Sequence, residues 1–274
     1  MTNDGIMTSE FDDAGTIDPG DAAADEDYDE FDVRDLDERP FVEDDDDDDV
    51  DLELVVLDMA GTTVVDDGLV VRAFERAAEE AGIGETPEER ASALEYVQQT
   101  MGQSKIAVFR VLAVNEDQAQ HANAVFESAY AEFVETYGVT AVAGAEEVIG
   151  LLRDSGVKVA LTTGFAPPTA TAIIQALGWE DLADVVLSPA DAGRGRPYPD
   201  LPLTALLRTG ASSVESMVVV GDTTSDIASG IAAGAGLVVG VLTGAHDEAA
   251  LSDAGADAVI GSIADLPALL GFDD

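Results

Sequence analysis

The sequence predicts an α/β protein with a parallel β-sheet core and a helical cap inserted after the first strand. From residue 53 onward, short apolar segments alternate with segments of helical periodicity, which is typical of a parallel sheet covered by helices on both faces. Between residues 69 and 137, four helical patterns follow one another without an apolar strand segment. This run of helices indicates a small helical cap above one edge of the sheet.

Each element is expected from its own apolar pattern: a short apolar run for a strand, and apolar residues three or four positions apart for a helix. In chain order we expect a strand at 53–58; helices at 69–82, 87–100, 104–114, 116–137 and 144–155; a strand at 157–163; a helix at 167–178; a strand at 184–188; a helix at 200–209; a strand at 216–221; a helix at 225–234; a strand at 236–241; a short helix near 246–253; and a strand at 257–260. The predicted division is a disordered acidic tail at 1–50, a core made of 51–66 and 140–274, and the cap at 67–139.

The chain is extremely acidic, with a formal net charge of −45 over its 274 residues. Residues 1–50 hold 22 of the 57 acidic residues and two of the 12 basic ones, so −20 lies in the tail and −25 in the remainder. An acidic tail is typical of a solvated or partner-binding segment. An acidic folded body as well indicates adaptation to a salt-rich cytoplasm, because salt screens the repulsion between like charges. We do not expect nucleic-acid binding, since phosphate contacts require clustered lysine and arginine.

The composition also limits the chemistry and the location. The chain has no cysteine, which excludes disulfides and thiol catalysis. No secretory signal is recognisable, and no apolar run approaches the ~18 residues of a membrane span. We therefore expect a cytoplasmic protein that does not interact with membranes.

Two apolar segments end in carboxylates. Residues 54–63 read Leu-Val-Val-Leu-Asp-Met-Ala-Gly-Thr-Thr, with Asp58 at the end of the strand, and residues 217–226 place Asp222 and Asp226 after a similar strand. The carboxyl ends of parallel strands meet at one edge of the sheet, where ligands bind. Clustered carboxylates suit a hard cation such as Mg²⁺. Helix capping is the competing explanation for each aspartate alone, but the two matching segments favour a functional site.

Two further segments are predicted to reach the same edge. The strand at 157–163 ends in Thr162-Thr163-Gly164, where a hydroxyl and backbone amides can bind a phosphate oxygen, although a simple capped turn has the same pattern. The segment Gly-Arg-Gly-Arg-Pro-Tyr-Pro at 193–199 contains Arg196, which is suited to offset charge on a transferring phosphoryl group. A surface-loop arginine is the alternative.

These four segments, in this order, resemble the haloacid dehalogenase superfamily. The resemblance implies a Rossmann-like core, Mg²⁺ dependence and an aspartyl-phosphate intermediate. It implies that Asp58 is the nucleophile, and it places Arg196 where most members have lysine. The substrate-binding residues that it implies are Gly61, Thr62, Thr163 and Gly164. The metal-binding residues that it implies are Asp58, Ala60 (through its carbonyl), Asp222 and Asp226.

Ala60 departs from the pattern of most phosphatases in this superfamily, which carry a second aspartate two residues after the nucleophile. That aspartate protonates the leaving oxygen, and its loss would cost a phosphate-ester hydrolase roughly 10²–10⁴ in rate. Either the leaving group needs no acid, or another residue supplies one.

The surroundings of Lys105 bear on which kind of leaving group the substrate has. This lysine is one of only two in the chain and lies in Met-Gly-Gln-Ser-Lys-Ile at 101–106, at a loop-to-helix transition in the cap. Together with the segments around Asp58 and Arg196, this motif resembles the phosphonoacetaldehyde hydrolases. The likeness implies that Lys105 forms a Schiff base with the substrate aldehyde, so that the C–P bond breaks to an enamine. A random surface lysine is the competing explanation.

Two positions differ from that subgroup: Val108 replaces a common histidine, and Phe165 replaces a usual tyrosine. The expected partner is therefore a small phosphonate or phosphorylated substrate. A phosphomonoesterase acting on a compound such as phosphoglycolate or a sugar phosphate is the alternative activity. A non-enzymatic role, with the tail recruiting a basic partner, is a third hypothesis. A homodimer is considered as well. His121 and His246 lack metal-spaced partners and are interpreted as structural.

Overall fold

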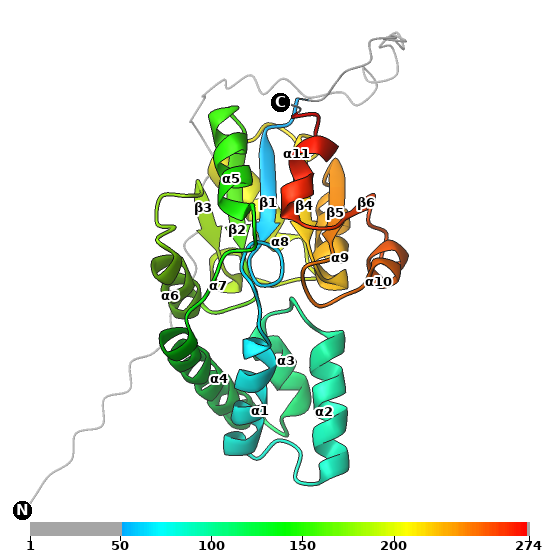
Figure 1. Cartoon of the computed structure of the whole chain (residues 1–274). Helices are drawn as coiled ribbons and strands as arrows, with labels where there is room; N and C mark the ends of the chain where they lie inside the picture. The colour runs from blue at the N-terminus through cyan, green and yellow to red at the C-terminus, as the bar shows by residue number, and fades with distance from the viewer. Residues whose placement is uncertain (1–50, 273–274) are drawn as a thin grey trace, which may run out of the picture. The chain divides into compact units, whose positions relative to one another are not determined.

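The computed structural model describes residues 51–272, so the predicted tail at 1–50 lies outside the described residues. Its centre is one six-stranded sheet in which every paired strand is parallel (Figure 1). The strands, in chain order, are β1 Leu54–Asp58, β2 Lys158–Thr162, β3 Val185–Leu187, β4 Met217–Gly221, β5 Leu237–Val241 and β6 Ala258–Ile260. Their spatial order is β3-β2-β1-β4-β5-β6, which is the Rossmann order, so the predicted fold class is confirmed.

The sheet register brings the ends of three strands level with one another. Asp58 at the end of β1 is paired with Thr162 at the end of β2, and Leu57 is paired with Val220 of β4. β1 and β4 are neighbours at the point where the strand order reverses, which is where open α/β sheets form their ligand-binding crevice.

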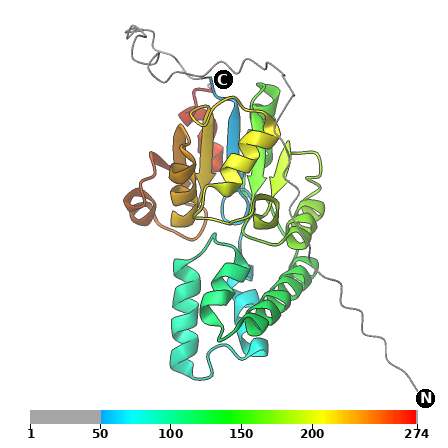
Figure 2. The same ribbon diagram turned by 180° about the vertical axis from the view of Figure 1, so that it is seen from behind.

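The alternation of side chains along β1 divides the core between the two faces of the sheet. Val55 and Leu57 belong to a buried cluster that includes residues of α5 (Ala145–Asp154), α6 (Pro167–Leu177) and α11 (Leu266–Leu269). Leu54 and Val56 pack on the other face with residues of α8 (Asp200–Thr209) and α9 (Thr224–Ala233). Figure 1 shows α5 and α11 in front of the sheet, and Figure 2 shows α8 and α9 in front of it. A strand buried on both faces explains why β1 is apolar throughout.

The cap, as the term is used below, is the helical segment Leu69–Tyr137. It contains α1 Leu69–Ala81, α2 Pro87–Gln99, α3 Lys105–Leu112 and α4 Glu116–Tyr137. Phe74 of α1 stacks on Phe109 of α3 with ring centroids 4.3 Å apart, and Phe126 of α4 packs edge-on against both rings. Helix α2 buries only Val97. Among residues 51–272, none of the helices has both the length and the apolar character that crossing a membrane requires.

The long elements begin and end within two residues of the predicted positions, with the short helix α10 at Glu248–Asp253. The sequence patterns missed three short elements: helix α7 at Pro189–Ala192, the 3₁₀ turn η2 at Ile263–Asp265, and α11. None is long enough to show an apolar periodicity. Local capping defines α7, since Asp191 accepts hydrogen bonds from the backbone N–H and the hydroxyl of Ser188.

Candidate active site

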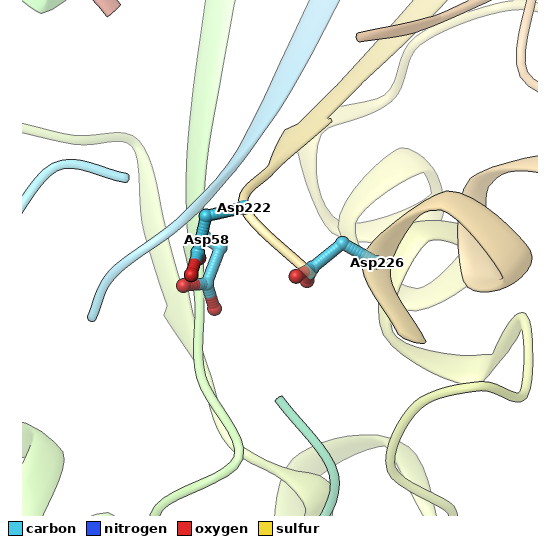
Figure 3. A group of neighbouring side chains, drawn as sticks. All are labelled: Asp58, Asp222 and Asp226. Atoms are coloured by element: carbon cyan, nitrogen blue, oxygen red, sulfur yellow. The ribbon is translucent and has the colours of Figure 1, made fainter. Parts of the chain in front are cut away.

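Three aspartates from two strand ends meet at the edge of the sheet (Figure 3). Asp58 ends β1, Asp222 follows β4 directly, and Asp226 lies in the first turn of α9. Each is buried, and each offers a carboxylate oxygen within 4.8 Å of the others. The sequence predicted this grouping from the positions of the aspartates after parallel strands. The three side chains form what we call the aspartate cluster.

Asp222 is held by two loops that approach it closely. It accepts hydrogen bonds from the Thr62 hydroxyl at 3.2 Å and from the Ala245 backbone N–H at 2.8 Å. A Cβ atom on Gly61 or on Gly244 would clash with the Asp222 carboxylate, so both positions require glycine. Thr62 is fully buried and is not among the residues that line the cavity described below. The structure therefore places Thr62 as a support for Asp222, whereas the sequence suggested a substrate contact.

Asp226 is both a helix-capping residue and a member of the aspartate cluster, and its sequence context suggested each of these roles. Its carboxylate accepts hydrogen bonds from the Thr223 backbone N–H at 3.1 Å and from the Thr223 hydroxyl, which completes a capping box at the start of α9. Its other oxygen lies 2.6 Å from Arg196 Nε. One oxygen of Asp226 is thus paired with Arg196 and the other is held by Thr223. Asp222 accepts from the neutral donors Thr62 and Ala245, and Asp58 pairs with Arg196 through one oxygen, so these two carboxylates are better placed to bind a cation directly.

Arg196 connects the aspartate cluster to the cap. Its side chain is buried, with Nη1 2.7 Å from Asp58 and a hydrogen bond at 2.6 Å from Nη2 to the Thr162 hydroxyl. Nη1 also donates to the backbone carbonyl of Gly102 in the cap, at 3.3 Å. Five donors in a fixed plane make arginine suited to such a multi-partner position. The surface-loop alternative for Arg196 is therefore wrong.

The electrostatics of the cluster favour binding of a cation. Burial raises the pKa of the Asp58 carboxyl well above its usual range; the Arg196 charge opposes this rise, and the charges of Asp226 and Asp222 add to it. Burial, followed by the Asp226 charge, raises the pKa of Asp222 to about 7. A divalent cation would relieve this repulsion, and an all-oxygen donor set suits Mg²⁺. The residues present therefore fit the metal that the sequence led us to expect.

The segment after β2 forms the neighbouring wall of the site. Thr163 is buried, and its hydroxyl accepts a hydrogen bond from the Phe165 backbone N–H at 3.2 Å. Thr163, Gly164 and Phe165 all line the same cavity as Asp58. The structure thus brings Thr163 and Gly164 to the strand edge where the sequence placed a phosphate-binding turn.

The cap loop at residues 100–104 is seated directly on the core. The Lys105 backbone N–H donates to the Gly164 carbonyl at 3.4 Å. A Cβ atom on Gly164 would lie 2.5 Å from the Gln103 carbonyl oxygen, and one on Gly102 would clash with the Thr223 hydroxyl. Such close backbone approach requires glycine on both sides of the contact.

Lys105 is buried at this junction, which excludes the surface-lysine interpretation. Its Nζ lies 5.3 Å from the centroid of the Phe165 ring, and within the described part of the chain no carboxylate forms an ion pair with it. Burial lowers the pKa of the Lys105 amine; the charges of Asp58 and Asp66 oppose that shift, and the positive charge of Arg196 adds to it. A neutral amine is the form that attacks a carbonyl carbon.

Three residues that the sequence did not lead us to select lie in the site or next to it. Asp66 follows the first turn and lines the cavity, and burial raises its pKa. His246 lines the cavity as well, and its Nδ1 accepts the Thr224 backbone N–H at 2.9 Å. Glu127 of α4 accepts hydrogen bonds from the Ala166 N–H at 3.4 Å and from the Thr169 hydroxyl. Only Asp66 had a usable signal, a carboxylate close to a strand-end turn; the other two depend on the folded chain.

A single cavity of about 590 Å³ is lined by most of these groups, while Asp226, Glu127 and Thr62 lie outside its lining. The core contributes most of the residues predicted for the site, including Asp58, Gly61, Thr163, Arg196 and Asp222, and the cap contributes Lys105. The cavity therefore brings the carboxylates of Asp58 and Asp222 and the amine of Lys105 into one space.

Comparisons with known proteins agree with this geometry. A family model described as haloacid dehalogenase-like hydrolase matches residues 52–234. A phosphonoacetaldehyde hydrolase of Bacillus cereus strain AH820 is 30% identical over 214 residues, covering 72% of this chain and 78% of that protein.

Solved structures share the fold. A hydrolase from Pseudomonas syringae superposes with a TM-score of 0.71 at 23% identity, covering 81% of this chain and 98% of that one. A phosphonoacetaldehyde hydrolase-like protein from Oleispira antarctica superposes with a TM-score of 0.68 at 26% identity, covering 81% and 92%. The chain therefore belongs to the haloacid dehalogenase-like hydrolase family.

Proposed function

We propose that this hydrolase releases inorganic phosphate from a small carbonyl-bearing phosphonate, with Asp58 acting on phosphorus and Lys105 acting on carbon. The observation that carries the proposal is the buried Lys105 amine, whose pKa is lowered, in the same cavity as the Asp58 carboxylate. The similarity to phosphonoacetaldehyde hydrolases supports it.

The proposed reaction begins at carbon. Neutral Lys105 adds to the substrate carbonyl to form a carbinolamine. The carbinolamine loses water to give an imine, which is protonated to an iminium ion. The Asp58 carboxylate then attacks phosphorus while the C–P bond breaks, and the electron pair of that bond moves into the iminium to give an enamine. No alkoxide leaves, so this step does not require the acid that is missing at Ala60. Protonation of the enamine carbon and hydrolysis free the carbonyl product and Lys105, and water converts the aspartyl phosphate to inorganic phosphate.

The neighbouring residues have defined roles in this scheme. Arg196 holds the Asp58 carboxylate and offsets negative charge at the phosphoryl group. Thr163 and Gly164 supply hydrogen-bond donors at the phosphate oxygens. Asp58, Asp222 and the Ala60 carbonyl would hold Mg²⁺, which supplies charge neutralisation between the phosphonate and the carboxylate when it is bound.

A phosphomonoesterase is the second candidate function. It is favoured by the negative charges of Asp58, Asp66 and Glu127, each of which acts to keep the Lys105 amine protonated. In that case Lys105 would bind an anionic group of the substrate and form no covalent bond. Lys105→Arg should then keep most of the phosphate release from a small phosphate ester.

Borohydride trapping separates the two functions. The protein is incubated with phosphonoacetaldehyde, reduced, and mapped by peptide mass spectrometry. We expect an adduct on Lys105 and none on Lys158, an exposed lysine paired with Asp184 at 3.2 Å. Its yield should rise with pH, with a midpoint below the ordinary lysine pKa of 10.5. An unmodified Lys105 together with undiminished phosphate release would reject the Schiff-base proposal.

A further inference from the structure

The cavity is larger than the smallest carbonyl phosphonate requires. Phosphonoacetaldehyde has about seven non-hydrogen atoms; at ~10–15 Å³ for each, the cavity volume that one water molecule needs, it fills ~100 Å³. The cavity has a volume of about 590 Å³. The cap loop already contacts the core at Gly164 and Thr223, so further closure at that point cannot remove the excess.

Helices α1 and α2 contribute lining residues that the proposed reaction does not use. Val70, Val71 and Met101 form an apolar section of the wall. Helix α2 contributes three further residues to the lining, the exposed side chains Glu95, Gln98 and Gln99. Their spacing of three and four positions puts them on one face of the helix. We call this face the α2 rim.

The charge distribution along the cavity is asymmetric. The arginine and lysine of the lining are Arg196, which pairs with Asp58, and Lys105, to which the proposed reaction assigns the phosphoryl group and the carbonyl carbon respectively. The α2 rim has one carboxylate and two amides, with Gln99 Nε2 3.4 Å from the Glu95 carboxylate. A substrate extension that reaches this rim meets hydrogen-bonding groups and a negative charge, and it meets no arginine or lysine of the lining.

His246 adds a donor to the lining. Because its Nδ1 accepts the Thr224 N–H, the neutral imidazole carries its proton on Nε2. The lining of the cavity thus combines a ring N–H donor with amides that both donate and accept. Such a set recognises hydroxyl groups, and the carboxylate of Glu95 disfavours an anionic extension.

We propose that the substrate is a 2-oxoalkyl phosphonate whose carbonyl carbon bears an uncharged, hydroxylated carbon chain that reaches the α2 rim. This inference rests on the proposed function and specifies its substrate class. The bonds that form and break are unchanged: Lys105 forms the imine with the ketone, the C–P bond breaks, and the products are inorganic phosphate and a hydroxylated methyl ketone.

The test compares phosphate release from three probes at saturating Mg²⁺. The probes are phosphonoacetaldehyde, 4-hydroxy-2-oxobutylphosphonate, and phosphonopyruvate, whose carbonyl carbon bears a carboxylate. We expect the hydroxylated ketone to have a kcat/KM at least about tenfold above that of phosphonoacetaldehyde, in line with the discrimination that a pocket contact provides. Phosphonopyruvate should be the poorest of the three.

Variants of the α2 rim test the assignment of the binding surface. The double variant Gln98→Ala, Gln99→Ala should lower the ratio of kcat/KM for the hydroxylated ketone over phosphonoacetaldehyde by about tenfold. Ser92→Ala, at an exposed position of the same helix outside the lining, should leave the ratio unchanged. Thermal melting of each variant confirms that α2 remains folded.

The outcomes distinguish this inference from the proposed function on which it rests. A higher kcat/KM for phosphonoacetaldehyde than for the hydroxylated ketone, with a Lys105 adduct still formed, overturns the inference and leaves the proposed function intact. The inference is also overturned if the variant Gln98→Ala, Gln99→Ala leaves the ratio of kcat/KM for the hydroxylated ketone over phosphonoacetaldehyde unchanged. Phosphate release from none of the three phosphonates overturns the proposed function and the inference together.

Discussion

Arg196 forms a buried ion pair with Asp58, with Nη1 2.7 Å from the carboxylate. Asp58 is the residue that accepts the phosphoryl group in the proposed reaction, so this contact orients the nucleophile while it offsets the substrate's charge. The same guanidinium binds Asp226 at 2.6 Å, so a single side chain links both strand-end segments. Several consequences of this arrangement can be measured.

Replacing Arg196 with methionine should leave two buried carboxylates without their cation. We expect the rate of phosphate release to fall at least about 10²-fold, as it does when a preorganised charge-stabilising donor is lost. The free energy of unfolding should fall by ~3–5 kcal/mol, because uncompensated buried charge is costly. Steady-state kinetics and urea denaturation check both values.

Arg194 offers the matched control for Arg196. It lies two residues away, is largely exposed, and pairs with Asp200 at 2.6 Å. Arg194→Met should change stability by no more than ~1 kcal/mol and leave turnover intact, because exposed ion pairs contribute little. Equal effects of the two substitutions would contradict the role given to Arg196.

Gly164→Ala should disturb the seating of the cap loop. The new methyl group would lie 2.5 Å from the Gln103 carbonyl oxygen and 2.9 Å from that of Gly102, and both are backbone atoms. We expect slower turnover and slower Lys105 adduct formation. Gly150→Ala in α5 is the control, because a Cβ atom there meets nothing within 4 Å and alanine favours a helix. Adduct formation at the wild-type rate in both variants would contradict this role of Gly164.

Glu127 is expected to hold the segment after β2 against the cap. Helix α6 has Ala166 at its N-cap and no side-chain cap of its own, and Glu127 of α4 supplies the acceptors. Glu127→Ala should lower the free energy of unfolding by ~1 kcal/mol, the usual loss for a helix cap. It should also slow adduct formation when this is measured at a pH above the Lys105 pKa, where loss of the Glu127 charge no longer changes the protonation of the amine. The contact lies next to Phe165, whose ring is 5.3 Å from Lys105 Nζ.

Asn115 separates the capping effect of Glu127 from its effect on Lys105. Asn115 is the N-cap residue of α4, and its side chain accepts a hydrogen bond from the Gln118 backbone N–H at 2.9 Å. Asn115→Ala should cost a similar ~1 kcal/mol and leave adduct formation unchanged. If both variants slow the adduct in proportion to their loss of stability, Glu127 has no positioning role.

Mg²⁺ should stabilise the protein more strongly as the pH rises through about 7. The pKa of Asp222 is raised from 3.8 to about 7, so the metal-free folded protein holds a proton between these values that the unfolded chain has lost. This group's contribution to stability therefore falls as the pH rises through that window. The metal competes with that proton, and binding adds ~2.7 kcal/mol at a hundredfold excess over Kd. Thermal melts with MgCl₂ and with EDTA should differ more at about pH 8 than at about pH 6; a difference that is constant with pH would contradict this assignment.

The strand framework and the aspartate cluster were predictable because they depend on local pattern and on one topological rule. Apolar runs identify β1 and β4, and the carboxyl ends of parallel strands share one edge of the sheet, so Asp58 and Asp222 were expected at the same edge. That β1 and β4 are neighbours there is given by the structure. Lys105 could be selected because lysine is rare in this chain, but its burial depends on how the cap loop packs against Gly164.

Other features of the site could not be read from the sequence. Glu127 is 39 residues from Ala166, and only the packing of α4 against α6 makes it a cap. The engagement of both Asp226 oxygens depends on where the Arg196 side chain lies. The polar face of α2 also has no signal of its own, because exposed glutamine and glutamate are common on any helix.

The proposal assigns the chemistry at phosphorus to Asp58 and the chemistry at carbon to Lys105. It is tested most directly by incubating Asp58→Asn with phosphonoacetaldehyde and borohydride and measuring the mass of the adduct on Lys105. In the wild-type protein, reduction after C–P cleavage should leave an ethyl group on Lys105. In Asp58→Asn the imine still forms but phosphorus has no acceptor, so the trapped group should retain the whole phosphonoethyl unit, and no phosphate should be released. An ethyl adduct or continued phosphate release in Asp58→Asn would contradict the account.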